Sequence, residues 1–372
     1  MVTGLASLWR GVFGLFLTPL VACAPAAPAA PPTPSAPAAA QAPAPTAAVA
    51  PTTPPATETV RLGLLSSASD SGIFIALDQG YFREQGIEVE MTPFDSAARM
   101  VAPLGAGQLE VGAGSHSAGL FNAVARGIDI KLVADKGSAL PGFGFQALVF
   151  RRDLVESGQL RNPGDLRGLR ATVPARGITP EAALAHWLRP YGLTLDDLEI
   201  VELNFADHAS ALAGRAVEAS VTIEPFLTRV LDLGVGTIYQ RTDELLPGYQ
   251  IAEIIYSGQF IRERPEAARR FMLAYLKGVR FYNDAFVRGD LAKRQEVVAS
   301  LVRNTPVKDV ALYDRMVMPG LHPDGRMNVT SLNEDQEFWL SRGLQQGRIN
   351  FDDLIDYTFA NYAVEALGGP YR

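Results

Sequence analysis

The sequence predicts an α/β protein built as two lobes, each a mixed, mostly parallel sheet flanked by helices, with a ligand cleft between the lobes. Strand-like and helix-like segments alternate over residues 59–134, which is typical of a layered α/β unit. The same alternation starts again at residue 146 and continues to residue 239. After residue 256 the chain becomes mostly helical, as expected of a tail that packs against one lobe. Clefts between such units are common ligand sites.

Length and composition are those of a globular protein with two packed domains. The chain has 372 residues, of which 48% are hydrophobic and 20% are charged, so it can bury a sizeable core. The net charge is −7, and no long block of like charges occurs. This pattern argues against an extended nucleic-acid surface, and we expect no nucleic-acid partner.

The N-terminal segment has the pattern of a secretory signal. Residues 5–22 are apolar and carry a single positive charge, at Arg10. Residues 20–23, Leu-Val-Ala-Cys, resemble the lipobox of bacterial lipoproteins, which implies that Cys23 is lipidated and that residues 1–22 are removed. The alternative is an uncleaved membrane helix, although the apolar run is near the lower length limit for spanning a bilayer. Both interpretations place the folded part outside the cytoplasm, on the periplasmic side or the outer surface of the cell membrane.

A Pro-rich tether follows the signal. Residues 24–57 consist almost wholly of Pro, Ala and Thr and show no apolar periodicity. At about 3 Å per residue, such a tether can hold a domain up to roughly 100 Å from its anchor. Cys23 is the only cysteine, so the folded part contains no disulfide and no Cys-based zinc site. We therefore expect residues 23–57 to link a lipid anchor in the membrane to the folded part.

The first unit alternates strands and helices in a regular order. We predict strands at residues 59–65, 87–91, 110–113 and 130–134, and helices around residues 73–77, 104–109 and 119–125. Ligands of such sheets bind at the carboxyl ends of the strands. The loops that follow the strands are therefore the ones to consider, at residues 66–72, 94–96, 114–117 and 136–144.

The second unit and the tail are predicted in the same way. The second unit has strands and helices at residues 146–150, 162–173, 180–188, 199–203, 207–213, 217–223 and 237–239. In the tail, apolar side chains at three- and four-residue spacing predict a long amphipathic helix over residues 265–288. Thr305 and Pro306 are predicted to open another helix as N-cap and N1 residues. Two further helices are expected at residues 332–343 and 352–367.

Several motifs resemble one group of solute-binding proteins. Residues 75–90 resemble the signature A-x-x-x-G-Y-F-x-x-x-G-(I/L)-x-V, and residues 104–112 resemble L-x-x-G-x-(I/L)-D-(V/I)-(G/A), with Glu110 in place of the commoner Asp. Further motifs follow in the family's order, at residues 162–168, 191–197, 224–225 and 321–325. Over residues 58–368 the chain resembles the substrate-binding proteins of ABC importers, in the thiamine-pyrimidine (NMT/THI-type) and alkanesulfonate/nitrate/taurine group.

The resemblance implies the type II periplasmic-binding-protein fold and a role in solute uptake. It implies two crossings between the lobes, near residues 146–151 and 252–258. Lobe 1 then comprises residues 58–147 and 253–372, and lobe 2 comprises residues 148–252. The implied partners are a small-molecule solute, over which the lobes close, and an ABC permease with its transmembrane subunits and ATPase. We expect a monomer that delivers the solute, although a solute sensor feeding a membrane receptor would share this fold.

One relative in this group is an enzyme, the yeast-type pyrimidine synthase of thiamine biosynthesis, with a Cys-rich CCCGC motif and active-site histidines. No cysteine follows Cys23 here, which argues against that activity. No P-loop, nucleophile elbow or dinucleotide-binding motif occurs. Metal-ligand spacing is also missing among the four histidines, His116, His186, His208 and His322. We therefore predict no catalytic residue, no metal and no cofactor.

Loops of the first unit supply ten candidate ligand contacts. Free N–H groups and hydroxyls at a helix start attract polar ligand atoms, which favours the loops at 94–96 and 114–117. The alternatives are local, with Phe94 in the core and with Asp95 and Ser117 as ordinary N-caps. The candidates are Ser67, Asp70, Phe94, Asp95, Ser96, Gly114, Ser115, His116, Ser117 and Phe143.

Three loops of the second unit supply the other candidates. They are Arg176 and Thr179, then Asn204, Phe205 and Asp207, and finally Glu224. Arg176 can pair with an anionic ligand, or it can be a solvated surface residue. The middle loop offers an amide, a ring and a carboxylate. Glu224 matches the family's Glu-Pro, in which the Glu often faces the cleft, and its alternative is a capping or hinge role.

The aromatic residues at the loop ends favour a planar ligand. They are Phe74, Phe94, Phe143, Phe145, Phe205 and Phe226. Stacking on these rings suits a heteroaromatic solute, such as a thiamine-pyrimidine precursor or riboflavin. The runner-up is an oxyanion, either an alkanesulfonate or taurine, or nitrate, because the Ser-rich helix starts and Arg176 suit one.

Overall fold

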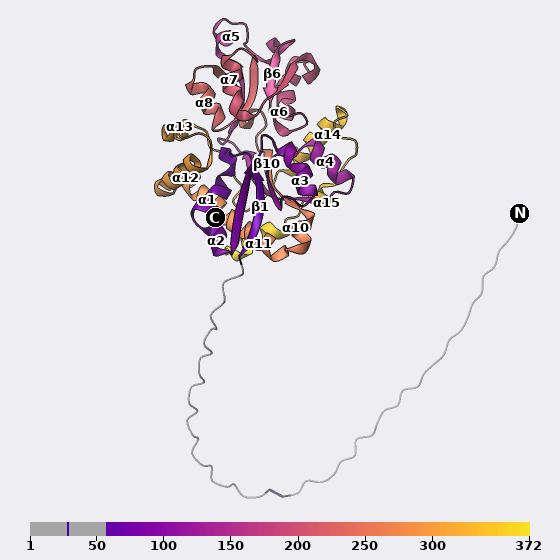
Figure 1. The fold of residues 1–372 in the computed structure, drawn as a ribbon, viewed down its shortest axis with the longest axis vertical. Coiled ribbons are helices and arrows are strands. Elements are labelled where there is room, and N and C mark those ends of the chain that lie inside the picture. The colour runs from indigo at the N-terminus through magenta and orange to yellow at the C-terminus, as the bar shows by residue number, and fades with distance from the viewer. Residues whose placement is uncertain (1–27, 30–56) are drawn as a thin grey trace, which may run out of the picture. The chain divides into compact units, whose positions relative to one another are not determined.

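The computed structural model describes residues 28–29 and 57–372 (Figure 1). The predicted signal at residues 1–22, Cys23 and nearly all of the predicted tether lie outside the described residues. Within the described part, no helix combines the length and the hydropathy that are needed to cross a bilayer.

The folded part contains two five-stranded mixed sheets flanked by helices, which confirms the predicted fold class (Figure 1). We call the part built on the first sheet lobe 1 and the part built on the second sheet lobe 2. The first sheet has the order β2 (Ile87–Pro93), β1 (Glu58–Leu64), β3 (Val111–Gly114), β10 (Tyr249–Ser257) and β4 (Ile130–Ala139). The second has the order β7 (Glu199–Glu202), β6 (Arg170–Val173), β8 (Ala219–Ile223), β5 (Gln146–Arg151) and β9 (Gly236–Arg241).

One strand in each sheet is antiparallel to the other four. These strands are β10 in the first sheet and β5 in the second, and each pairs antiparallel with both of its neighbours. β5 is the first strand after the chain enters lobe 2, and β10 is the first strand after it returns. The reversed strands therefore mark the two crossings between the lobes.

Both crossings lie a few residues earlier than predicted. β5 pairs with β8 from Gln146 onward, so the first crossing precedes residues 146–151. β10 pairs with β4 from Tyr249 onward, so residues 249–252 belong to the first sheet and the second crossing precedes residues 252–258. The predicted boundaries between the lobes differ from the observed ones because β5 and β10 are buried and mostly apolar. An apolar run of this kind does not indicate which of the two sheets it joins.

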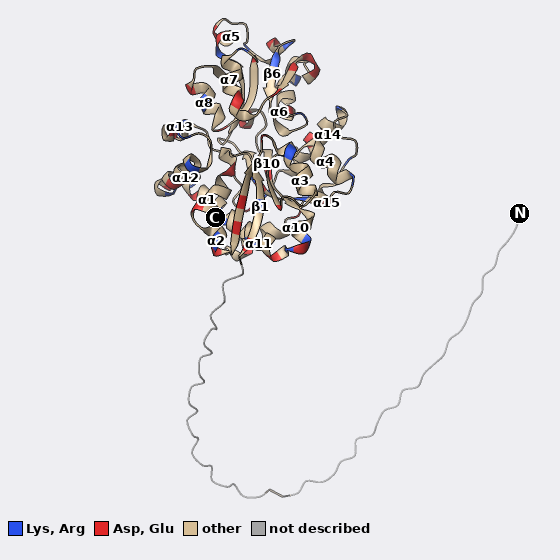
Figure 2. Cartoon of the chain, viewed as in Figure 1, with Lys and Arg blue, Asp and Glu red and all other residues tan. Residues whose placement is uncertain are grey.

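Short helices cover both sheets. Lobe 1 has η1 (Ala68–Asp70), α1 (Ser71–Asp78), α2 (Tyr81–Glu84), η2 (Ala97–Met100), α3 (Val101–Gly105) and α4 (Ala118–Ala125). Lobe 2 has α5 (Arg152–Glu156), η3 (Pro163–Leu166), α6 (Thr179–Leu188), η4 (Arg189–Tyr191), η5 (Leu195–Asp197), η6 (Phe205–Asp207), α7 (His208–Ala213), α8 (Phe226–Asp232) and α9 (Thr242–Leu245). Lys, Arg, Asp and Glu are interspersed over both lobes (Figure 2).

The helical tail begins with α10 (Gly258–Glu263) and α11 (Pro265–Phe286), and α11 confirms the long predicted helix. It continues with α12 (Leu291–Asn304), α13 (Val310–Arg315), α14 (Val329–Ser341), α15 (Phe351–Leu354) and α16 (Thr358–Ala366). The predicted helix start at Thr305 and Pro306 is wrong, because Thr305 is the C-cap of α12 and Pro306 lies beyond the helix end. The predicted helix at 352–367 is interrupted, because Ile355 bridges to Leu132 in β4.

The core of lobe 1 depends on close packing between α1 and α11. The apolar face of α11 is fully buried at Phe271, Tyr275 and Tyr282. Two glycines allow the two helices to approach, since a Cβ at Gly278 would overlap the carbonyl oxygen of Gly72. Lobe 2 has a separate core that includes the fully buried Trp187.

We expect Gly278→Ala to lower the free energy of unfolding by about 1–3 kcal/mol, because the added methyl group forces α1 and α11 apart. Urea denaturation measures this change. Gly119→Ala is the matched control, since Gly119 is also helical but exposed, with no heavy atom closer than 3.7 Å to an added Cβ. There, alanine should stabilise the protein by about 0.5–1 kcal/mol. Equal stability of the Gly278→Ala variant and the parent protein would contradict the packing account.

Candidate functional site

A cavity of about 520 Å³ lies between the two lobes, and we call it the cleft. Its walls are the loops that follow β1 and β2 in lobe 1, the segments that follow β7 and β8 in lobe 2, and the end of α12. It is lined by Leu65, Ser66, Pro93, Phe94, Asp95, Asn204, Phe205, Ala206, Asp207, Phe226, Asn304 and Pro306. The carboxyl ends of strands from both sheets thus meet at one cavity of the size that small ligands occupy.

Three phenylalanine rings line the cleft, one from lobe 1 and two from lobe 2. Phe94 follows β2 and is half-buried, so part of its ring is accessible. Phe205 and Phe226 stack on each other, with ring centroids 6.2 Å apart and ring planes at 13°. The cleft therefore offers ring contacts from both lobes to a planar molecule.

The polar groups of the cleft are amides, a hydroxyl and carboxylates. Asp95 accepts a hydrogen bond from Arg99 at 3.2 Å, and Asp207 accepts one from the amide of Asn204 at 2.6 Å. Ser66, directly after β1, has a φ of 54°, a left-handed conformation that is uncommon outside glycine. Among the described residues that line the cleft, none is Lys, Arg or His. The lining therefore carries negative formal charge.

Ser67 and Asp70 are buried and do not line the cleft. Asp70 accepts a hydrogen bond from the backbone N–H of Ser67 at 2.8 Å and forms an ion pair with Lys136 at 2.8 Å. Lys136 also donates to Ser69 at 2.8 Å, and all of these side chains are closed off from solvent. This buried pair fixes the loop whose first residues, Leu65 and Ser66, do reach the cleft.

The loop at residues 114–117 does not line the cleft, and its polar groups form hydrogen bonds within the protein. The backbone N–H of His116 donates to Glu253 at 2.8 Å, and the hydroxyl of Ser117 caps α4 by accepting from Leu120 N–H at 3.0 Å. The next N–H, of Ala118, donates to the carbonyl of Gly177 in lobe 2 at 2.8 Å. The N–H groups of His116, Ala118 and Leu120 are therefore bound within the protein. Ser117 is an ordinary N-cap, which is the alternative to ligand binding.

Four more candidates of lobe 1 also lie outside the cleft lining. Ser115 and Ser96 are buried, and Ser96 is the N-cap residue of η2. Gly114 packs so closely on Ala97 that a Cβ would overlap the Ala97 side chain. Phe143 is half-buried against the core of lobe 1. The expected stacking of a ligand on Phe74 and Phe145 is wrong, because both side chains are only 1% exposed. Phe74 belongs to the core of lobe 1 and Phe145 to the core of lobe 2.

Arg176 and Thr179 do not reach the cleft. Arg176 is exposed on lobe 2, 3.6 Å from the carboxylate of Glu181 and 3.8 Å from that of Glu202. Thr179 is buried and donates a hydrogen bond at 3.2 Å to the carbonyl of Ile251 in β10. Arg176 therefore interacts with carboxylates on the surface of lobe 2, and Thr179 joins lobe 2 to β10 of the first sheet.

Glu224 is fully buried behind the cleft. Its carboxylate caps α8 by accepting from Thr228 N–H at 2.9 Å and lies 3.8 Å from Arg241. Burial raises the pKa of Glu224 to about 7, against these stabilising contacts. Its backbone carbonyl accepts from Ala68 N–H of lobe 1 at 3.2 Å. The side chain of Glu224 thus has the capping role that is the alternative to a cleft-facing one.

Sequence reasoning missed part of the cleft lining. Ser66 opens the loop after the first predicted strand, Leu65 ends that strand, and Pro93 directly precedes the loop at residues 94–96. Their closeness to the strand ends is the signal that could have found them. Asn304 and Pro306 come from the end of α12, in the tail. No local pattern marks these two residues, because their place depends on how the tail packs.

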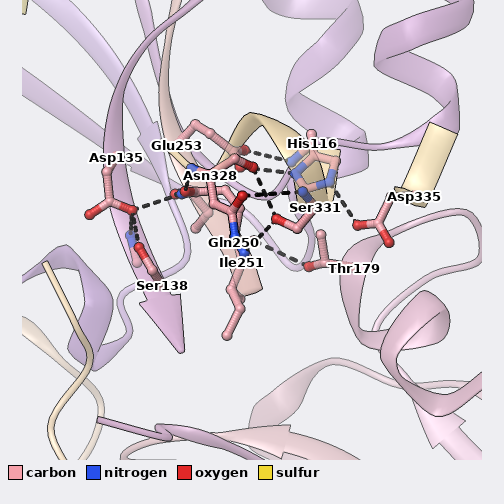
Figure 3. A network of polar contacts seen from close by, with 12 residues as sticks. His116, Asp135, Ser138, Thr179, Gln250, Ile251, Glu253, Asn328, Ser331 and Asp335 are labelled. Carbon is pink, nitrogen blue, oxygen red and sulfur yellow. Dashed lines mark hydrogen bonds and ion pairs between the residues drawn. The ribbon is translucent and has the colours of Figure 1, made fainter. Parts of the chain in front are cut away.

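A network of buried polar groups holds β10, and its centre is His116 (Figure 3). Nδ1 of His116 lies 2.9 Å from the carboxylate of Glu253 in β10, and Nε2 lies 2.9 Å from that of Asp335 in α14. The hydroxyl of Tyr249 donates to Asp335 at 2.7 Å. Burial alone would lower the pKa of His116, but the charge of Glu253 and the hydrogen bonds to both carboxylates raise it to about 9. The ring is therefore a buried imidazolium at neutral pH.

The same network continues through Gln250 (Figure 3). Its side-chain amide donates to Asp135 in β4 at 2.7 Å, and its carbonyl oxygen accepts from Asn328 N–H at 3.0 Å. Its backbone N–H donates to the hydroxyl of Ser331 in α14 at 2.9 Å. Burial raises the pKa of Asp135 to about 6, although hydrogen bonds from Ser138 and from His322 N–H oppose the rise. The returning strand is thus tied to β3, β4 and α14 at once.

We expect the charge on His116 to make stability depend on pH. Because folding raises its pKa from 6.5 to about 9, its protonation stabilises the fold fully below about pH 6.5. This contribution falls as pH rises through about 9, by on the order of 3 kcal/mol. Urea denaturation at pH 6.0, 7.5 and 9.5 measures it.

His116→Gln is the comparison that isolates this effect. The difference in unfolding free energy between parent and variant should be largest at pH 6.0 and smallest at pH 9.5. A difference that is constant across these pH values would show that His116 is not charged in the folded protein.

Comparisons with known proteins agree with this geometry. The profile of the family described as "NMT1/THI5 like" matches residues 68–284, more than half of the chain. A protein of Brucella abortus named as a binding protein is 24% identical over 220 residues, which is 57% of this chain. The match spans 63% of the length of that curated relative, and relatives from Brucella suis and Brucella melitensis give the same values.

Solved structures share the fold at low identity. A ligand-binding component of an ABC-type import system from Staphylococcus aureus has a TM-score of 0.66 at 14% identity, covering 82% of this chain and 99% of that one. The alkanesulfonate-binding protein SsuA from Xanthomonas axonopodis pv. citri has a TM-score of 0.65 at 15% identity, with 81% and 99% covered. The periplasmic nitrate-binding protein NrtA from Synechocystis PCC 6803 has a TM-score of 0.69 at 14% identity, with 84% and 89% covered.

An enzyme has the same fold, since the desulfurization enzyme DSZB has a TM-score of 0.57 at 16% identity, covering 83% of this chain and 99% of that one. Fold alone therefore does not separate binding from catalysis. The family match covers β2–β10 and residues from both sides of the cleft. Together with the two sheets, it confirms the resemblance found in the sequence motifs: this chain belongs to the NMT1/THI5-like family and has the two-lobed fold of periplasmic binding proteins.

Proposed function

We propose that this protein is an extracytoplasmic solute-binding lipoprotein of an ABC importer, and that its solute is a small planar heteroaromatic molecule without negative charge. The observation that carries the proposal is the lining of the cleft, which combines three phenylalanine rings with carboxylates and amides. A thiamine-pyrimidine precursor and riboflavin are examples of the ligand class. The solute lies between Phe94 of lobe 1 and the stacked Phe205 and Phe226 of lobe 2.

Ring contacts from both lobes support a planar ligand. A flat molecule that enters between the lobes buries one face on each wall, and aromatic pairs gain stability beyond the area that they bury. Asn204 and Asn304 add amide donors and acceptors for ring nitrogens and carbonyl oxygens. Shape and hydrogen bonding thus favour a heteroaromatic ring over an aliphatic chain.

The charge of the cleft disfavours an oxyanion. Arg176, on which the sulfonate alternative depended, lies outside the cleft lining and beside two carboxylates of lobe 2. Asp95 and Asp207 would repel a sulfonate or nitrate. SsuA and NrtA are named for alkanesulfonate and nitrate, so the proposal places this chain apart from them in ligand class.

Delivery of the solute to a permease is proposed from the shared fold with a component of an import system and from the predicted lipid anchor. The Staphylococcus aureus protein of the same fold is named as part of an ABC-type import system. In our proposal, lipidated Cys23 and the Pro-rich tether hold the two-lobed part near the membrane, and the lobes close by a hinge at the crossings before β5 and β10.

The competing class is an enzyme, as DSZB illustrates for this fold. The described lining of the cleft contains no Cys, His, Lys or Tyr, so general acid–base or nucleophilic roles would fall to Ser66, Asp95 and Asp207. Mass spectrometry of the bound molecule tests this point. A solute recovered unchanged after incubation supports binding, and a solute converted to product supports an enzyme.

We expect riboflavin or a thiamine pyrimidine to bind the parent protein, and Phe205→Leu to weaken that binding about tenfold. Leucine keeps an apolar side chain but removes the ring face, which is worth about 0.5–1.5 kcal/mol beyond buried area. Phe143→Leu, at a half-buried ring outside the cleft, should leave affinity unchanged. Isothermal titration calorimetry measures both variants, with an alkanesulfonate as the third ligand. Tight sulfonate binding without heteroaromatic binding would overturn the proposed ligand class.

We also expect charge selectivity to depend on Asp207. Asp207→Asn keeps an acceptor beside Asn204 but removes a negative charge, so thiamine, a permanent cation, should bind about five- to tenfold more weakly. Affinity for riboflavin, which is neutral, should not change. Asp352→Asn, an exposed change in α15, is the control. An equal loss of affinity for thiamine and riboflavin would mean that Asp207 contributes through shape rather than charge. Unchanged affinity for thiamine would show that the charge of Asp207 does not contribute to binding.

A further inference from the structure

A fully buried histidine, His208, lies behind the two rings that lobe 2 contributes to the cleft. It is the first residue of α7, and its ring contacts that of Phe205, with the centroids 5.4 Å apart and the planes at 57°. Phe205 in turn stacks on Phe226. Both phenylalanines line the cleft, whereas His208 does not. The aromatic wall of lobe 2 is therefore packed against a polar side chain.

Two hydrogen bonds fix the orientation of the His208 ring. Nε2 lies 2.9 Å from the carbonyl oxygen of Leu203, and Nδ1 lies 2.8 Å from the hydroxyl of Ser220. A carbonyl oxygen can only accept, so Nε2 carries the proton. Burial lowers the pKa of His208 to about 4, although the bond to the Leu203 carbonyl opposes the shift. The ring is therefore neutral at pH 7, and Nδ1 accepts the hydroxyl proton of Ser220.

The same two hydrogen bonds join the two segments of lobe 2 that line the cleft. Leu203 directly follows β7 and precedes the segment that carries Phe205. Ser220 belongs to β8, the strand that leads to Phe226. His208 therefore connects both segments, and the place of one phenylalanine ring relative to the other depends on how His208 is held.

Further hydrogen bonds hold the segment after β7. The backbone N–H of Asp207 donates to the side-chain oxygen of Asn204 at 3.2 Å, and the Asn204 amide donates to the Asp207 carboxylate at 2.6 Å. The backbone N–H of Leu203 donates to the carbonyl of Val173 in β6 at 3.1 Å. The bond from His208 adds a connection to β8, so the segment is tied to two strands of the second sheet.

We propose that His208 is a positioning residue of the solute site, which holds the ring of Phe205 through its two hydrogen bonds in the orientation that stacks on a planar solute. The inference rests on the proposed function, because it takes Phe205 to be a contact of the solute. A ring that is held before binding loses less conformational entropy when the solute arrives. Loss of the two hydrogen bonds therefore weakens binding, even though every residue that lines the cleft is kept.

Fluorine NMR of the full chain, with para-fluorophenylalanine at residue 205 alone, tests the positioning without any solute. His208→Gln keeps an amide donor and acceptor, whereas His208→Phe keeps a ring and removes both hydrogen bonds. Ser220→Ala removes one hydrogen bond and leaves all three rings in place, so it also decides the matter if His208→Phe does not fold.

We expect a single sharp resonance in the parent protein and in His208→Gln, and a broadened or split one in His208→Phe and Ser220→Ala. A single sharp resonance in the last two variants would overturn the proposal. Equal broadening in His208→Gln and His208→Phe would overturn it as well, because the hydrogen bonds would then not be what holds the ring.

Isothermal titration calorimetry with riboflavin and a thiamine pyrimidine gives the second readout. We expect binding to weaken about tenfold in His208→Phe and about threefold in Ser220→Ala, and to stay within about twofold of the parent in His208→Gln. Trp187→Phe is the control, because it removes a hydrogen bond of lobe 2, to Gln240 at 3.0 Å, at a residue outside the cleft lining. It should change neither the affinity nor the resonance of residue 205.

The two readouts separate this inference from the proposed function. Parent-like affinity in both His208→Phe and Ser220→Ala would overturn the role of His208 and leave the solute class standing. A parent protein that binds neither heteroaromatic solute would overturn the proposed function instead, and the fluorine spectra would then decide whether His208 holds the ring of Phe205.

Discussion

The structure depends on how the returning strand β10 is held in the first sheet. β10 lies between β3 and β4 with all nine of its residues buried, although Tyr249, Gln250 and Glu253 carry polar groups. Buried polar groups must find partners, and a buried carboxylate must find a positive one. His116 supplies that charge to Glu253 and Asp335 together, so one imidazolium joins the β3–α4 loop, β10 and α14. The position of α14 on lobe 1 follows from this demand for satisfied polar groups.

The same arrangement determines what the lobes present to each other. Loops after β3 and β6 meet through backbone hydrogen bonds, and Ala68 in the loop after β1 meets Glu224 after β8 in the same way. Leu65 and Ser66, together with the segments after β2 and β7, enclose the cleft beside these contacts. The tail contributes on both sides. The end of α12 lines the cleft, and α14 packs near α6 of lobe 2 on another side of the molecule, where the two enclose a separate cavity. Two cavities thus arise from one interlobe geometry, and the lining of the cleft carries negative formal charge.

Much of the fold could be predicted from the sequence, because strands and helices of an α/β protein follow from local apolar periodicity. Phe94, Asp95, Asn204, Phe205 and Asp207 line the cleft, and the sequence points to them because they come shortly after strands. Ser117, Thr179 and Glu224 follow strands as well, but their polar atoms are bonded within the protein. A short sequence pattern does not distinguish these two outcomes, since both use the same residue types at the same places. Thr305 and Pro306 show the same ambiguity for helices, because a cap and a proline occur at either end.

The contacts that join the lobes near the cleft are mostly made by the main chain. Ala118 N–H binds Gly177, Ala68 N–H binds Glu224, and Ser117 bridges to Ile178 through its backbone. Main-chain groups are present whatever the side chain, apart from the N–H that proline lacks. The side chains that face the cleft can therefore be exchanged during evolution without disturbing how the lobes meet. A protein built in this way can acquire a new solute by substitution at a few loop positions, because the main-chain hydrogen bonds that join its lobes do not depend on those side chains.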